Sequence, residues 1–198
     1  ILREGLGNRT VDEAAHEAIE AIIDTPMATP GNVEFADADS MVVIEGSYDH
    51  LAMERSRDRV VVRSNMFVLL GELNDPQDTS SPARYRRALE LLGPRAGGVT
   101  TDDLKSVSKD HGNGPGLDSI CRHSEDYHDE TSLSAMIVAT NRDDPGKTSV
   151  DIAVGKPCWA WDHGGVVSLE MGEPHELIAE RFLNGDAWKD FYREDARA

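Results

Sequence analysis

The chain has 198 residues, of which 39% are hydrophobic, and its formal net charge at pH 7 is -17. This length is enough for one domain of generous size or two small ones, with an adequate hydrophobic core. A surface this acidic repels phosphate groups, so nucleic acids and anionic membranes are poor candidates for partners.

Lysine is scarce: of the 20 basic residues only five are lysines, against 37 acidic residues. High negative charge with few lysines suits a cytoplasm rich in salt, where screening weakens the repulsion between like charges. We therefore expect a cytoplasmic protein from a halophilic source, with an ordinary acidic cytosolic protein as the alternative. The sequence shows no signal-peptide pattern and no apolar run of the about 20 residues that a spanning helix needs.

A helix is predicted at residues 11–24. Thr10 and Glu13 have the spacing of a capping box, in which each side chain accepts a hydrogen bond from the backbone amide of the other residue. His16 lies off the apolar face and should be solvated. The apolar residues recur at helical spacing and form one stripe: Val11, Ala14, Ala15, Ala18, Ile19, Ile22 and Ile23.

Two β-prone runs follow at residues 33–37 and 41–46, and they predict a hairpin. Asp37 and Asp39 lie in its turn without the remaining ligands of a calcium loop, so we interpret the turn as solvated. Residues 54–58 are interpreted as a charged connection.

A strand is predicted at residues 59–63, and Asn65 comes directly after it, before an apolar segment. An Asn in that position can direct its amide N–H groups into a cleft, where such donors stabilise a developing oxyanion. An Asn that satisfies a turn is the alternative interpretation.

Two more helices are predicted in the middle of the chain. The pair Ser81 and Pro82 is a strong helix start, with Ser as N-cap and Pro in the first turn, and residues 93–94 end this helix. A shorter helix is predicted from about residue 100 to about residue 109. Three arginines would form a solvated, salt-bridged face on the first helix: Arg84, Arg86 and Arg87.

The second half of the chain contains predicted strands at residues 132–140, 148–154 and 166–169, the first of them buried, and short helical turns at 176–183 and 187–192. The glycine-rich residues 111–116 lack the ending of a phosphate-binding loop and are interpreted as a flexible surface loop. Helices and strands come in separate groups, which favours an antiparallel, layered α/β arrangement.

Residues around position 121 have side chains that suit zinc: Cys121, His123 and His128, with Asp126 and Asp129 nearby. Their spacing matches no paired metal motif, so a polar loop with one partly buried thiol is the alternative. A nucleophilic pair of Cys121 with His123 or His111 would require hydrogen-bond contact, which sequence adjacency does not give. Cys158 is interpreted as a packed thiol, although the two cysteines allow one disulfide.

A series of short segments is ordered along residues 10–161. It includes Thr-Val-Asp-Glu-Ala at 10–14, Val-Val-Ile-Glu-Gly at 42–46, Arg-Ser-Asn-Met-Phe at 63–67, Ser-Ile-Cys-Arg-His at 119–123 and Val-Gly-Lys-Pro-Cys at 154–158. The series resembles the downstream part of the isopenicillin N acyltransferase-like family. Members of this family are self-processing amidohydrolases and acyltransferases with an N-terminal cysteine nucleophile, distantly similar to acid ceramidase and the bile-salt hydrolases.

The resemblance implies an α+β fold of the N-terminal-nucleophile hydrolase type, a four-layer αββα sandwich with mainly antiparallel sheets. It also implies a precursor that cleaves itself to free a Cys, whose α-amine, with a pKa of about 8, acts as the base. In this chain it implies that Asn65 belongs to the oxyanion hole and that Arg84 lies near the site. The resemblance further implies substrate contacts for Phe67, Arg122 and His123.

The nucleophile of this family lies upstream of the matching segments, and residue 1 here is Ile. We therefore expect residues 1–198 to be a single domain, the C-terminal portion of such an enzyme, present as a processed subunit or a truncated piece. The expected partners are a small-molecule linear amide or acylated amine, an upstream chain from the same precursor and further copies of the chain, with no cofactor and no metal. The alternatives are a non-catalytic acidic α/β subunit or binding domain, and a zinc-dependent hydrolase around Cys121 and His123.

Overall fold

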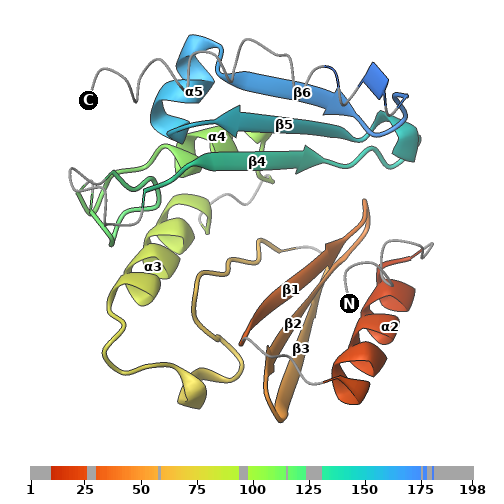
Figure 1. Ribbon diagram of the computed structural model, residues 1–198, viewed down its shortest axis with the longest axis vertical. Coiled ribbons are helices and arrows are strands. Elements are labelled where there is room, and N and C mark those ends of the chain that lie inside the picture. Colours follow the sequence, from red (N-terminus) through yellow and green to blue (C-terminus); the bar gives the residue numbers. More distant parts are fainter. Residues whose placement is uncertain are drawn as a thin grey trace. The chain divides into compact units, whose positions relative to one another are not determined.

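The computed structural model describes residues 10–25, 30–57, 59–93, 98–114, 116–123, 131–174, 176–177 and 180. The chain divides into two compact units, Ile1–Tyr85 (unit 1) and Arg86–Ala198 (unit 2). The described residues form two antiparallel three-stranded sheets, one in each unit, and four α-helices (Figure 1). The expected mixed α/β class with antiparallel sheets is therefore confirmed.

In unit 1, helix α2 (Val11–Asp24) begins at the capping box expected from the sequence. The Glu13 amide donates to Thr10 Oγ1 at 3.2 Å, and the Thr10 amide donates to Glu13 Oε2 at 3.1 Å. The apolar stripe of the helix packs on the middle strand of the sheet through the cluster of Val11, Ala15, Ala18, Ile22, Val42 and Ile44. His16 is exposed, as expected.

The sheet of unit 1 has the order β1-β2-β3, with strands Gly31–Ala36, Met41–Ser47 and His50–Ser56. The predicted hairpin is confirmed, because β1 pairs with β2 in antiparallel register. Asp37 accepts hydrogen bonds from the amides of Asp39 and Ser40 through Oδ1, both at 2.8 Å, so the turn between these strands satisfies itself.

The predictions for residues 54–63 are wrong. The third strand is β3, which pairs with β2 along its whole length after a tight turn in which Tyr48 has a left-handed φ of 33°. Residues 59–63 form no ladder with any described strand. The valines of residues 59–63 have high β-propensity, but propensity alone makes no strand without a hydrogen-bonding partner, and this segment joins neither β1 nor β3.

Helix α3 (Ser80–Leu92) ends just before Gly93, as expected, but it starts at Ser80, two residues before the predicted first helical residue, Pro82. Asp78 supplies the N-terminal capping group, since its Oδ1 accepts from the amides of Ser80 and Ser81, each at 3.0 Å. Ser81 therefore lies inside the helix and is not its N-cap. A 3-10 turn at Gly71–Leu73 precedes this segment.

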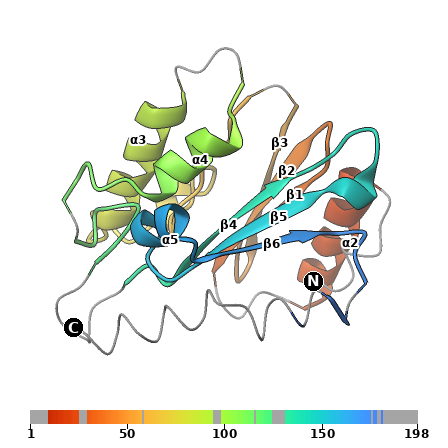
Figure 2. The same ribbon diagram turned by 90° about the horizontal axis from the view of Figure 1, so that it is seen from above.

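Unit 2 contains the sheet β4-β5-β6, with strands Ser134–Ala139, Ser149–Val154 and Val166–Glu170, and these three strands confirm the predicted positions. Helix α4 (Thr101–Ser108) contacts β4, helix α5 (Pro157–His163) contacts β5, and the two helices lie side by side (Figure 2). A 3-10 turn, Pro145–Lys147, lies between β4 and β5.

The prediction that the first strand of this sheet is buried is wrong. β4 is an edge strand, and of its side chains Met136 is 65% exposed and Val138 47% exposed. Ile137 is the buried residue of β4, and a buried apolar cluster joins β5 and β6, where Val154 and Val167 pack with Ile152 and Leu169. The helical turns predicted at 176–183 and 187–192 fall almost entirely outside the described residues.

No helix in the described part of the chain combines the length and the apolar character that a membrane crossing requires.

Candidate functional site

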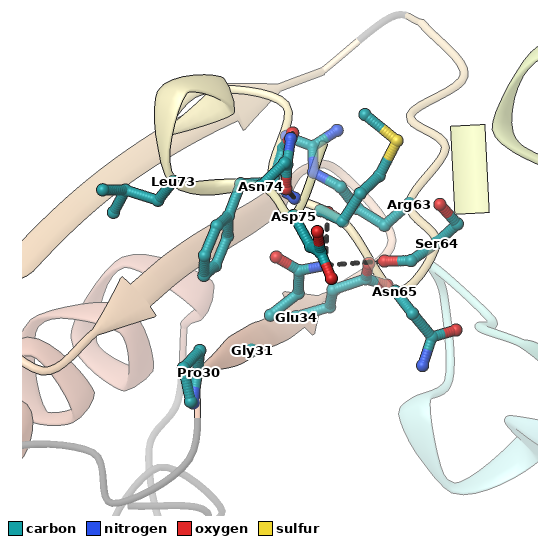
Figure 3. Close-up of a pocket in the computed structure, with 12 residues that line it drawn as sticks. Pro30, Gly31, Glu34, Arg63, Ser64, Asn65, Leu73, Asn74 and Asp75 are labelled. Carbon is teal, nitrogen blue, oxygen red and sulfur yellow. Dashed lines mark hydrogen bonds between the residues drawn. The ribbon is translucent and has the colours of Figure 1, made fainter. Parts of the chain in front are cut away.

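Unit 1 contains a pocket of about 570 Å³, within the size range of small-molecule sites. The start of β1, residues 63–67 and residues 73–75 form its wall. In the close-up, Pro30 and Leu73 lie on one side, and Arg63, Ser64 and Asn65 lie on the other (Figure 3). The pocket is thus built around the segment for which the sequence predicts an oxyanion donor.

Asn65 is at the tip of a tight turn. Ser64 and Met66 form an isolated antiparallel bridge, and the side chain of Asn32 donates to both of their carbonyls, at 3.1 and 3.4 Å. Asn65 itself is exposed, and its amide extends away from Pro30 and Leu73 (Figure 3). The turn therefore presents this side chain and does not use it to hold the backbone.

Arg84 fixes the orientation of the Asn65 amide. Its Nη2 donates to Asn65 Oδ1 at 3.2 Å and to Ser81 Oγ at 3.1 Å, and its Nη1 donates to Ser80 Oγ at 3.0 Å. Arg84 is only 8% exposed, so the prediction that it belongs to a solvated face is wrong. Because Oδ1 is engaged, the two Nδ2 hydrogens point elsewhere, and no described residue accepts a hydrogen bond from them.

The wall of the pocket is anchored by Glu45, which is completely buried. Its carboxylate accepts hydrogen bonds from the backbone amides of residues 68–70 at 2.8–3.1 Å. Nε of Arg63 lies 3.0 Å from Glu45 Oε1, at ion-pair distance but without hydrogen-bond alignment. Sequence reasoning missed this residue, although a lone carboxylate in an apolar central strand is itself a signal, since buried charges need partners.

Arg63 also pairs with Glu54, and its hydrogen bond holds the pKa of the Glu54 carboxyl below its usual value. Hydrogen bonds from Ser81, and then from Ser80, lower the pKa of Asp78 in the same way. Both carboxylates thus stabilise the segments that carry Arg63 and Arg84 more strongly when they are ionised than when they are protonated.

Phe67 is buried and lines the same pocket as Asn65. The Asn74 side chain holds it in place: the Phe67 amide donates to Asn74 Oδ1 at 2.7 Å, and Asn74 Nδ2 donates to the Phe67 carbonyl at 2.8 Å. The structure therefore brings together Asn65, Phe67 and Arg84 within unit 1.

The other two predicted site residues, Arg122 and His123, belong to unit 2. Arg122 pairs through its backbone with Ser132, whose Oγ accepts from the Arg122 amide at 2.9 Å. His123 joins a group of four metal-ligand types, here called the His–Cys cluster: His111, Cys121, His123 and Cys158.

The potential ligand atoms of the His–Cys cluster all lie within 4.8 Å of one another. Cys121 is fully buried, His123 and Cys158 are half-buried, and His111 is exposed. Burial raises the pKa of the Cys121 thiol to about 11. Burial, followed by the charges of His111 and Lys156, lowers the pKa of His123.

The membership of this cluster differs from the zinc set suggested by the sequence. His128, Asp126 and Asp129 lie outside the described residues. His111, interpreted as part of a surface loop, and Cys158, interpreted as a packed thiol, occupy the positions next to Cys121 and His123. No spacing motif joins these four residues, so the sequence carries no local signal for the set.

A scan of the sequence against protein-family models finds no match, and a search of curated proteins finds no matching relative. The family resemblance therefore stays a prediction from the short segments quoted above.

Proposed function

We propose that this chain is the downstream part of a cysteine N-terminal-nucleophile amidohydrolase or acyltransferase that acts on a linear amide or acylated amine. The observation that carries the proposal is that Asn65 belongs to the wall of a pocket of about 570 Å³ and that Arg84 holds the Oδ1 of its exposed amide. An amide fixed at its oxygen presents its N–H groups as donors, and fixed donors are what an oxyanion hole requires.

In this mechanism, the thiol of an N-terminal Cys that precedes residue 1 attacks the substrate carbonyl, and its own α-amine takes the thiol proton. The C=O π bond becomes a C–O⁻ single bond, and Asn65 Nδ2 donates to that oxygen. Collapse of the tetrahedral intermediate breaks the C–N bond, and the amine leaves with the proton from the α-ammonium group. Water or an acceptor amine then releases the acyl group from sulfur.

The lining of the pocket supports a substrate with two different ends. Phe67 and Leu73 offer apolar surface to an acyl chain, whereas Glu34 and Asp75 place carboxylates where an amine portion rich in N–H groups would bind. Arg84 acts as a positioning residue in this scheme, because its guanidinium holds the oxygen of Asn65 and also polarises the amide toward stronger N–H donation.

The proposal includes the four-layer αββα fold for the whole cytoplasmic enzyme. The two antiparallel sheets would supply strands of its central layers, and the upstream chain or a second copy would cover exposed apolar side chains such as Met53 on β3 and Met136 on β4. The alternative of a non-catalytic acidic subunit predicts no cleft near Asn65, and the pocket that Asn65 lines favours the enzymatic proposal.

The experiment that tests this function is N-terminal sequencing and intact-mass measurement of the complete natural gene product. We expect a precursor that separates into two chains, the second of which begins with Cys. Replacement of that Cys by Ala should leave the precursor intact. A single uncleaved product with no amidase activity toward acylated amines would contradict the proposal.

A further inference from the structure

The contacts within the His–Cys cluster cannot all be hydrogen bonds. Nε2 of His123 lies 3.0 Å from His111 Nε2, 3.1 Å from Cys158 Sγ and 3.6 Å from Cys121 Sγ. One imidazole nitrogen either donates a single proton or accepts with a single lone pair. Three close neighbours on the same atom therefore exceed what that atom can satisfy.

These three of the six separations in the cluster are close to those between ligands of one small ion. Zinc binds imidazole nitrogen at about 2.0–2.1 Å and thiolate sulfur at about 2.3 Å, so the edges of a tetrahedral site are about 3.3 Å between nitrogens and about 3.6 Å between nitrogen and sulfur. The observed contacts of 3.0, 3.1 and 3.6 Å differ from these edges by about half an ångström or less. The most distant ligand atoms, up to 4.8 Å apart, would have to approach by about 1 Å to match the longest edge of such a site, about 3.8 Å between two sulfurs.

We propose that His111, Cys121, His123 and Cys158 bind one Zn²⁺ ion in a tetrahedral site with a structural role. Thiolate and imidazole ligands together select zinc among the abundant divalent cations, whereas magnesium and calcium take oxygen ligands. Four protein ligands fill the coordination sphere and leave no open position for a catalytic water. The zinc site would therefore have a structural role and take no part in the proposed amidase reaction. Neither proposal depends on the other.

The backbone that carries His111 is held by its neighbour Asp110. The Asp110 carboxylate accepts two hydrogen bonds from Arg87, at 3.0 and 2.7 Å, and one from the Gly112 amide at 2.9 Å. A Cβ on Gly112 would lie 2.5 Å from Arg87 Nε, so a larger residue there would displace the Arg87 guanidinium from this ion pair. The loop is therefore fixed on both sides of His111.

Asp110 also holds the turn that carries Cys121. Its carbonyl accepts from the Cys121 amide at 3.1 Å and from Ser119 Oγ at 2.9 Å. Cys121 and Ser119 are both completely buried, which keeps the thiol at a single position. One residue thus couples the positions of two of the four ligands.

Cys158 is positioned by the start of α5. Gly155, with a φ of 96°, turns the chain out of β5, and Pro157 begins the helix. The amides of Trp159 and Ala160 donate to the Lys156 carbonyl at 3.0 and 2.9 Å, so Cys158 lies in a well-formed first turn. A metal at this point would tie the loop after α4 to the N-terminus of α5 across residues 111–158.

The test uses the complete gene product, purified under reducing conditions, and its metal content measured by inductively coupled plasma mass spectrometry. We expect one zinc per chain. After exchange with Co²⁺ we expect the d–d absorption of a tetrahedral ion together with thiolate-to-cobalt charge transfer. C158S and H123A should weaken metal binding by more than about 100-fold, because loss of an outer-shell partner alone costs about 10–100-fold.

H163A is the matched control, since His163 is on the same helix as Cys158 but stacks on Trp159. It should bind zinc as the unmodified protein does. Three results would overturn the proposal: no bound zinc even after addition of excess Zn²⁺, equal zinc content in C158S, H123A and H163A, or a Cys121–Cys158 disulfide in protein trapped with a thiol reagent on cell lysis. If C158S and H123A do not fold, the cobalt spectrum of the unmodified protein decides alone.

Discussion

The two units place polar side chains together in opposite ways. In unit 1, a buried carboxylate and a buried guanidinium are matched by partners within the chain: Glu45 accepts from three backbone amides, and Arg84 donates to two serines and to Asn65. In unit 2, the four side chains of the His–Cys cluster converge on one another. The Nε2 atom of His123 lies within 3.6 Å of a nitrogen or sulfur atom of each of the other three.

The pocket of unit 1 presents one hydrogen-bond donor, the amide of Asn65. The His–Cys cluster of unit 2 gathers four metal ligands. Buried polar groups are stable when each has a hydrogen-bond or ion-pair partner. A network of such partners also fixes the orientation of an exposed group that is attached to it. Asn65 is that outward group in unit 1. A convergent set of nitrogen and sulfur ligands becomes equally well matched only when a cation occupies its centre.

The largest expected effect tests the matched network of unit 1. Replacing Glu45 with Gln removes the charge opposite Arg63, whose side chain is only 6% exposed. Breaking a buried ion pair from one side costs about 3–5 kcal/mol. Because Arg63 keeps its ion pair with Glu54, we expect the free energy of unfolding to fall by about 3 kcal/mol, the lower end of that range. Chemical denaturation measures the change. E20Q, at an exposed position on α2, is the matched control and should shift stability by about 0.5 kcal/mol or less. Equal values for the two variants would refute the anchoring role of Glu45.

The next effect tests the convergent site of unit 2. With zinc at 100 times its dissociation constant, binding stabilises the folded state by about 2.7 kcal/mol. A strong chelator should therefore lower the thermal transition of the unmodified protein and should leave that of C158S unchanged. Calorimetry with and without chelator measures both. A chelator response of the same size in C158S would show that the effect arises elsewhere.

A smaller effect concerns the helix that carries Arg84. Asp78 caps α3, and hydrogen bonds from Ser81 and Ser80 lower its folded-state pKa. Its contribution is therefore fully present above the unfolded pKa of about 3.9 and is lost as the pH falls through the lower folded value. D78A should cost about 1 kcal/mol near neutral pH. D78N should keep the cap, because Asn is also a good N-cap residue. Since Asn does not titrate, D78N should lose less stability below about pH 4 than the unmodified protein does. Acid titration of helix content measures this difference. An unchanged acid profile in D78N would rule out this assignment.

The smallest effect is spread over both units. The net charge of -17 repels itself, and between about 0.1 M and about 1 M salt the Debye length falls from about 10 Å to about 3 Å. We expect the melting temperature to rise with potassium chloride over this range. Sucrose at equal osmolality is the control, because it does not screen charge. A melting temperature that falls with added salt would contradict the halophilic interpretation.

Local signals in the sequence were enough to predict several elements. The capping box at Thr10 marks the start of α2, the short helix predicted from about residue 100 is α4, and the turn around Asp37 marks the first hairpin. The strand at residues 59–63 was mispredicted because its valines have β-propensity, but the segment pairs with neither edge strand of the sheet, β1 or β3. Pairing depends on residues that lie elsewhere in the chain, which propensity does not record.

The two sites show the same limit. Asn65 was identified because it follows an extended segment directly, but the buried Glu45 and the role of Arg84 in orienting the amide depend on contacts across the fold. In the His–Cys cluster, Cys121 and His123 are neighbours in sequence, whereas His111 and Cys158 meet them only when the loop after α4 and the start of α5 come together. A metal site can be predicted from ligand spacing in the sequence only when the ligands lie within a short motif.

The most direct test of the central claim is the rate of the complete, processed enzyme with Asn65 replaced by Ala. Loss of one oxyanion donor reduces kcat by about 10²–10³, and we predict a reduction of that size with KM and unfolding free energy little changed, because Asn65 is exposed. N113A, which removes an exposed Asn from a loop of unit 2, is the control and should keep the full rate. A kcat for N65A equal to that of the unmodified enzyme would contradict the assignment of Asn65 to the oxyanion hole.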